Sequence, residues 1–225
     1  MSFTKDVQIT EEEWQLMVKE LSNFSSGRHW HGFAWHASRL AMIDPVRYKK
    51  IAITDQDWDA LIDELSHFQE VEDWQSVGAR LSHLKLLDPA RGAILVVPDD
   101  LWQALVNELD NLRKIKAWPP FISHAHHLRG ADADRFHPGL VTDDDWQNVI
   151  KALELEKVDG NWDFVAKIGL AMALTDEERT KSELKFSDTD WNNMFVVLES
   201  SRQQGYWGPF AAQASRLKIL TELLV

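Results

Sequence analysis

The chain lacks cysteine altogether, and it also lacks long hydrophobic runs and any excess of positive charge. The absence of cysteine excludes a disulfide framework, a thiolate metal site and a cysteine nucleophile, and it fits a cytoplasmic location. No apolar stretch approaches the roughly 20 residues that a membrane span needs, and residues 1–6 carry no sign of a secretory signal. The net charge of −12 disfavours nucleic acid and anionic membranes as partners.

Glycine is also sparse, since the 225 residues include ten glycines scattered along the chain. The sequence therefore contains no glycine-rich phosphate loop and no nucleophile elbow. The acidic residues that do cluster have an explanation in helix capping. We therefore expect a non-enzymatic protein that needs no cofactor.

Tryptophan, in contrast, is abundant, and ten of the eleven tryptophans form five pairs. Within each pair the second tryptophan follows 16 residues after the first, and successive pairs are 44 or 45 residues apart. The pairs are Trp14 and Trp30, Trp58 and Trp74, Trp102 and Trp118, Trp146 and Trp162, and Trp191 and Trp207. Such a period is typical of stacked helical repeats, in which each unit buries its apolar face against its neighbours. We expect these indoles to be structural.

The first tryptophan of each pair lies in a predicted amphipathic helix, because apolar residues follow it at three, four and seven positions. In the first unit these are Met17, Val18 and Leu21. Four units place Thr or Ser four residues before this tryptophan and Asp or Glu one residue before it, which is capping-box spacing. The third unit has Pro98 at the cap position, so we expect Asp99 to cap there instead.

The second tryptophan opens a second helix, which Asp44-Pro45 and Asp88-Pro89 end in the first two units. The sequence thus predicts an all-α, α-solenoid-like array of five two-helix units of about 44 residues, forming one elongated domain over residues 1–225. The units span approximately residues 7–50, 51–94, 95–138, 139–183 and 184–225. Alternating apolar residues before each cap leave room for very short extended segments between units.

The first turn of the first helix is acidic in every unit. If the units stack in parallel, these helix starts follow one edge at the 8–10 Å spacing of packed helices and form a continuous negative rim. Capping and the helix dipole explain the carboxylates without a partner, whereas the alternative is a surface that attracts a basic protein. The candidate binding residues are Glu11, Glu12, Asp55, Asp99, Asp100, Asp143, Asp144 and Asp188.

Trp35 is the one tryptophan outside the repeat, and Arg39 lies one helical turn after it. By helical phase Trp35 sits opposite the buried stripe, where an exposed tryptophan beside arginine has the composition of a binding hot spot. Alternatively, it covers the first helix as part of an atypical terminal repeat. The last unit is also unusually apolar, so either self-association or its own C-terminal residues should cover it.

The histidines offer a competing interpretation as a metal site, with His124, His126 and His127 closest together. Their helical phase, shared with arginines in other units, places them on an outward-facing surface stripe. His124 and His127 have the spacing to share a metal, but no metalloenzyme motif accompanies them. We therefore expect a protein-binding module whose acidic rim captures or neutralises a basic protein, as an inhibitor or immunity protein does. The alternative is a metal-dependent binder or enzyme that uses these histidines.

Overall fold

The computed structural model describes residues 6–225, and its helices form five tandem pairs. The predicted all-α helical-repeat array is confirmed. The first helices of the pairs are α1 (Glu11–Ser26), α4 (Asp55–Glu70), α7 (Asp99–Lys114), α9 (Asp143–Val158) and α12 (Asp188–Gln204). The second helices each begin at a tryptophan and are α2 (Trp30–Ile43), α5 (Trp74–Leu87), α8 (Trp118–Ala131), α10 (Trp162–Thr175) and α13 (Trp207–Leu224).

The very short extended segments that the sequence left possible between units do not form strands, because no strand occurs between residues 6 and 225. A short helix lies between each inner helix and the next outer helix, namely α3 (Pro45–Tyr48), α6 (Pro89–Ala93), η1 (Pro138–Leu140) and α11 (Glu177–Glu183). Asp44 ends α2 and caps α3, since its carboxylate accepts hydrogen bonds from the next backbone N–H groups. The dipeptide Asp-Pro therefore stops one helix and starts another. In this described part of the chain, no helix is both long and apolar enough to cross a membrane.

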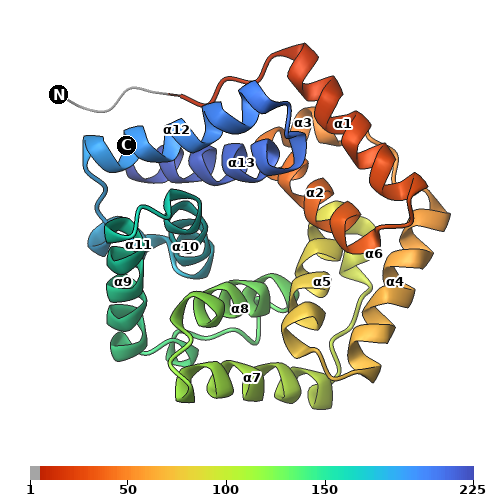
Figure 1. Cartoon of the computed structure of the whole chain (residues 1–225). Coiled ribbons are helices and arrows are strands. Elements are labelled where there is room, and N and C mark those ends of the chain that lie inside the picture. The colour runs from red at the N-terminus through yellow and green to blue at the C-terminus, as the bar shows by residue number, and fades with distance from the viewer. Residues whose placement is uncertain (1–5) are drawn as a thin grey trace.

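The five units close into a ring, so the expectation of an elongated rod is wrong (Figure 1). The first helices follow one another around the perimeter, and the second helices line the inside. Each inner helix packs against the next in the cycle α2, α5, α8, α10, α13, and α13 then packs against α2 and α1. The inner helix of the apolar last unit is thus covered by the first unit, and its Leu220 is fully buried, whereas Val196 on the outer helix α12 (Asp188–Gln204) remains 65% exposed.

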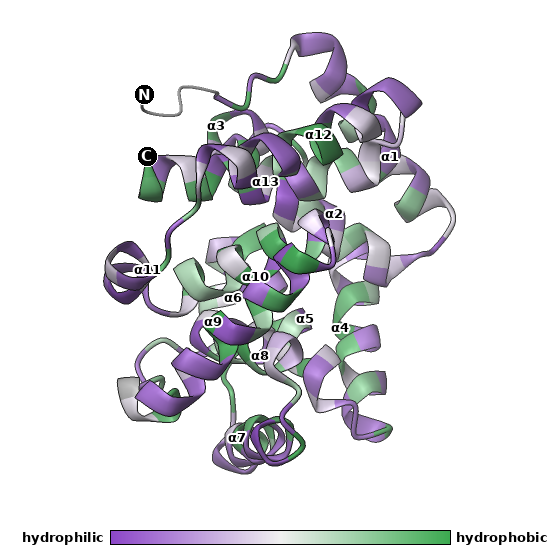
Figure 2. Ribbon diagram, turned by 60° about the vertical axis from the view of Figure 1, so that its left-hand side comes forward, coloured by the Kyte–Doolittle hydropathy of each residue, from purple (hydrophilic) through white to green (hydrophobic). Residues whose placement is uncertain are grey.

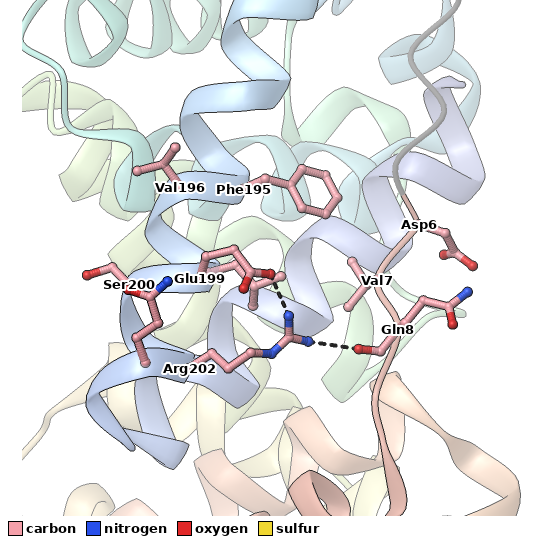
Figure 3. Close-up of a pocket in the computed structure, with 10 residues that line it drawn as sticks. Asp6, Val7, Gln8, Phe195, Val196, Glu199, Ser200 and Arg202 are labelled. Atoms are coloured by element: carbon pink, nitrogen blue, oxygen red, sulfur yellow. Dashed lines mark hydrogen bonds and ion pairs between the residues drawn. The ribbon is translucent and has the colours of Figure 1, made fainter.

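The joint that closes the ring repeats the contacts of the joints inside the chain. Arg113, at the end of α7, contacts the capping carboxylate of Asp145 in the next unit at 2.9 Å. Arg202, at the same position of α12, contacts the capping carboxylate of Glu13 in the first unit at 2.6 Å. Arg202 also donates to the carbonyl oxygen of Gln8 at 2.9 Å (Figure 3), and Arg113 reaches the carbonyl at the equivalent position. The first unit therefore packs against the last unit as a following repeat would.

The paired tryptophans are buried or half-buried in the ring. Trp14, Trp146 and Trp191 are at most 4% exposed, and the other seven lie partly covered. The second tryptophan packs edge-on against a phenylalanine three residues later in three units, as Trp118 does against Phe121 with ring centroids 5.7 Å apart. Hydrophobic and hydrophilic segments alternate along the outer helices α4 and α7, as expected for amphipathic helices with one face inward (Figure 2).

The turn between the two helices of a unit has the same backbone conformation in all five units. In every unit the residue 14 positions after the first tryptophan has a positive φ, between 56° and 74°. These residues are Arg28, Glu72, Lys116, Gly160 and Gly205. Glycine adopts this left-handed conformation without strain, whereas the other three side chains pay an energetic cost of about 1 kcal/mol. The shared turn keeps the units alike despite their different sequences.

Candidate functional site

The starts of the outer helices form a regular set of acidic corners. Four of them carry the predicted capping box, in which a Thr or Ser hydroxyl and an acidic side chain satisfy each other's backbone N–H groups. At α7 the expectation that Asp99 caps is wrong, because Pro98 occupies the cap position and no side chain caps that helix. Asp99 instead pairs with Arg135 at 3.2 Å.

In four of the five units an arginine from the segment after the inner helix covers the perimeter tryptophan of the same unit. Arg91 lies over the ring of Trp58 at 5.5 Å and pairs with Asp55 at 2.7 Å. The same three-residue arrangement occurs in three other units, with Arg47 on Trp14 and Glu11, Arg135 on Trp102 and Asp99, and Arg179 on Trp146 and Asp143. Our sequence interpretation missed these arginines. Their spacing of 44 residues, three positions after an aspartate that also recurs every 44 residues, is the signal that could have found them.

The predicted acidic residues divide into two classes. The four carboxylates paired with these arginines lie at the first helical position, and Asp143 remains 97% exposed despite its ion pair. The second position, occupied by Glu12, Asp100 and Asp144, neither closes a capping box nor forms an ion pair within the described chain, and Asp188 also has no ion pair there. The carboxylates of the second class are therefore not needed for helix capping or for ion pairs within the described chain.

The expected spacing of these helix starts is wrong. Because the outer helices follow one another around the ring instead of stacking side by side (Figure 1), their starts lie at separate corners. A helix of 16 residues is roughly 24 Å long at 1.5 Å per residue, which is several Debye lengths at physiological salt. The perimeter thus carries separate acidic patches rather than one continuous rim.

The centre of the ring has the opposite charge. The inner helices carry a basic cluster, of which five members lie 21 or 25 residues after the first tryptophan of their units and His126 lies 24 residues after it. We define this central cluster as Arg39, His83, His126, His127, Lys167 and Arg216. The members come from all five inner helices, and their positive charges act on one another's pKa values. Asp163, which pairs with Arg216, is the carboxylate that acts on Arg39 and Lys167.

Arg39 differs from Arg216 in its partners, although both are about 95% buried. Arg216 contacts Asp163 and donates to the side-chain oxygen of Gln213 at 3.2 Å. Among hydrogen-bond acceptors Arg39 contacts only the sulfur of Met42, at 3.6 Å, whereas the Nε atoms of both arginines have no hydrogen-bond partner within the described chain. Burial, followed by the charge of Arg216, lowers the pKa of Arg39 to about 9. Arg39 is therefore a charged, buried side chain without a carboxylate bonded to it at neutral pH.

The predicted outward-facing stripe of histidines and arginines is wrong, because these side chains are buried or half-buried between helices. His124 is 2% exposed and donates from Nε2 to the carbonyl oxygen of Leu105 in its own unit at 2.9 Å. His36 and Gln213 occupy the same position in their units and make the same kind of bond. One part of this stripe packs against the outer helix of its own unit, and the other part meets neighbouring inner helices once the ring closes, so neither part faces outward.

The geometry gives no support to a metal site at His124 and His127. Across residues 6–225, no group of three or more His, Asp or Glu side chains is arranged to hold a metal ion. His124 is committed to its bond with Leu105. His127 packs instead against His126 and His83, with ring centroids 3.8 Å and 5.4 Å away.

Trp35 lies on the inner helix α2 and is half-buried. The guanidinium of Arg39 lies 5.4 Å from the centre of its ring, so the predicted pair of tryptophan and arginine does form. The pair belongs to the inside of the ring, however, and is not brought together with the acidic corners. Because the ring has no free end, Trp35 does not act as the cover of a terminal repeat.

The molecule has hollows at its joints and beside the central cluster. The groove at the closing joint has a volume of about 550 Å³ and is lined by Val7, Phe195, Val196 and Arg202 (Figure 3). A similar groove occupies the joint between the second and third units. A smaller hollow of about 250 Å³ lies at the first turns of α5, α8 and α10, with His127 and Lys167 in its lining.

Comparison with known proteins does not identify a family for this chain. No family model, no characterised protein and no solved structure matches it. The function is therefore inferred from the acidic corners, the central cluster and the hollows.

Proposed function

We propose that this protein is a non-enzymatic binding module that captures a basic protein partner at its acidic corners, in the manner of an inhibitor or immunity protein. The observation that carries the proposal is the second class of helix-start carboxylates, Glu12, Asp100, Asp144 and Asp188. These groups are exposed and have no ion pair within the described chain. Because surplus exposed carboxylates of this kind raise the local negative potential, they favour rapid encounter with a positively charged surface.

The ring determines how such a partner is received. A standard protein interface covers about 800 Å² on each side, which is enough for one corner and its neighbouring outer helix. Since the corners are separated by the length of a helix, one partner engages one or two corners rather than the whole perimeter. Charge at a corner then accelerates association, while the apolar contacts that hold the complex come from the adjoining helix surface.

Capture from a lysate of the native cells tests the proposal. The wild-type protein and a variant with Glu12→Gln, Asp100→Asn and Asp144→Asn are each immobilised, and retained proteins are identified by mass spectrometry at low and high salt. We expect the wild type to retain a basic protein, and we expect retention to fall with rising salt and with the triple substitution.

A matched control carries Asp63→Asn, Glu70→Gln and Asp159→Asn, which remove the same net charge from exposed positions away from the helix starts. This control should retain the partner as the wild type does. If the helix-start variant retains the same proteins as the wild type at every salt concentration, the corners are not the binding surface and the proposal fails.

A further inference from the structure

The centre of the ring carries more buried positive charge than its carboxylates neutralise. Arg216 has Asp163 as a partner, and Arg80, which lies next to the cluster, has Glu64. Arg39 and Lys167 have no ion pair within residues 6–225. We propose that the central cluster binds a small phosphate-type oxyanion, which enters at the hollow lined by Lys167 and His127.

Arg39 is the group that most needs such a ligand. A buried guanidinium without a carboxylate is costly, because its lost hydration is not replaced. The nearby sulfur of Met42 is a weak acceptor, and Nε of Arg39 is unbonded. Arg39 does not line the hollow, but its charge acts on Lys167, which does, so an oxyanion bound there supplies the negative charge that Arg39 lacks.

Lys167 connects the buried charge to solvent. It is exposed, it lines the hollow, and its ammonium lies 5.5 Å from the ring of Phe164 in the same lining. Desolvation, and then the charges of Arg216 and Arg39, lower the pKa of Lys167, which shows that these three cations share one electrostatic environment. An anion bound at Lys167 is therefore also attracted by the positive charges of Arg39 and Arg216.

The lining and size of the hollow favour a small ligand. Gln75, Ser76 and Ser123 add neutral polar groups to the wall. The Nδ1 atom of His127, a residue of this lining, is buried and has no hydrogen-bond partner within the described chain. The volume of about 250 Å³ lies below the roughly 300–1,000 Å³ of pockets for larger organic ligands. An oxyanion, or the phosphoryl group of a small ester, fits this space better than a nucleotide or a peptide.

Titration calorimetry and thermal unfolding with the intact protein test the site. Inorganic phosphate and glycerol 3-phosphate are compared with chloride at equal ionic strength. We expect one phosphate per chain, and at about ten times its Kd we expect the unfolding temperature to rise by roughly 3–6 °C. Equal affinity for the two ligands indicates a free-ion site, and tighter binding of the ester indicates a site for a phosphorylated small molecule.

Two lysine variants separate this site from general attraction of anions. Lys167→Met should weaken phosphate binding at least tenfold, and because Lys167 is exposed the variant should still fold. Lys151→Met removes the same charge from an exposed position on α9 and should bind phosphate as the wild type does. If the wild type gains no stability over chloride, or if the two variants respond alike, the inference is wrong. The test is independent of the acidic corners, so its failure would leave the proposed partner binding untouched.

Discussion

The perimeter and the centre of the ring use arginine in opposite ways. Arg91 on the perimeter lies over Trp58 and pairs with the exposed Asp55, so its charge is both neutralised and partly solvated. Arg39 in the centre lies over Trp35 but has no carboxylate bonded to it, and it is 6% exposed. The first arrangement is a repeated structural device, present in four units. The second is a single departure from the repeat and is the better indication of function.

The largest expected difference between the two regions is their response to acid. Burial, and then the charges of Arg39 and its neighbours, lower the pKa of His83, and burial lowers the pKa of His126 to about 3 and strongly depresses that of His127. Unfolded histidines protonate near 6.5, so the unfolded state gains protons first as the pH falls. Each histidine should therefore remove up to about 1.4 kcal/mol of stability per pH unit below 6.5.

The perimeter should respond only at lower pH. Burial alone would raise the pKa of Asp145, but the hydrogen bonds from Arg113 and Thr142 outweigh it and lower the pKa below 3.8. The stability that Asp145 contributes is thus complete above about pH 4 and is lost as the pH falls through its folded pKa. Urea unfolding between pH 7 and pH 5 measures the contribution of the buried histidines, to which His36 and His124 also belong because burial lowers their pKa values. His126→Gln should reduce the slope, and a stability that does not change over this range would contradict the account.

The next largest effect concerns the indoles under the perimeter arginines. Trp146 is fully buried, so Trp146→Ala should lower the free energy of unfolding by roughly 3–5 kcal/mol. Trp102 is half-buried at the equivalent position, and Trp102→Ala should cost less. Chemical denaturation of both variants gives the comparison. Equal, small losses would show that the tryptophan repeat is not what holds the outer helices to the inner ones.

The smallest effects test the two kinds of arginine directly. Arg91→Met should destabilise the protein by up to about 1 kcal/mol, because a partly exposed ion pair and cation–π contact contribute little. Arg39→Met, in phosphate-free buffer, should be neutral or stabilising, since it replaces an unpaired buried charge by an apolar side chain. Thermal unfolding of both variants shows whether each substitution raises or lowers the stability. A larger loss for Arg39→Met than for Arg91→Met would mean that Arg39 holds the ring together.

The helices and their caps could be predicted because their signals are local. Thr142 and Asp145 lie three residues apart, and the apolar stripe of each helix repeats within seven residues. Ring closure depends instead on small rotations between successive units, which no short pattern encodes. A trace is nevertheless present, since Arg113, Lys157 and Arg202 each lie 11 residues after the first tryptophan of their units. In the structure each contacts the capping carboxylate of the following unit.

The candidate sites were predicted less well for the same reason. The acidic residues at the helix starts were identified from composition, but their separation at the corners follows from the ring. Arg39 and His127 were assigned to an outward-facing surface because their helical phase places them away from the apolar stripe of a two-helix unit. Their burial becomes intelligible only once five inner helices surround a common centre.

Cross-linking across the closing joint tests the ring most directly. Gln8 and Gln203 are exposed and line the same groove, and the natural chain contains no cysteine that would compete. With Gln8→Cys and Gln203→Cys, a short thiol cross-linker should join the two ends within one monomer at high yield. The control pair Gln8→Cys and Gln103→Cys, which places the second thiol on α7, should give no such product. A closing pair that links no better than this control would contradict the ring.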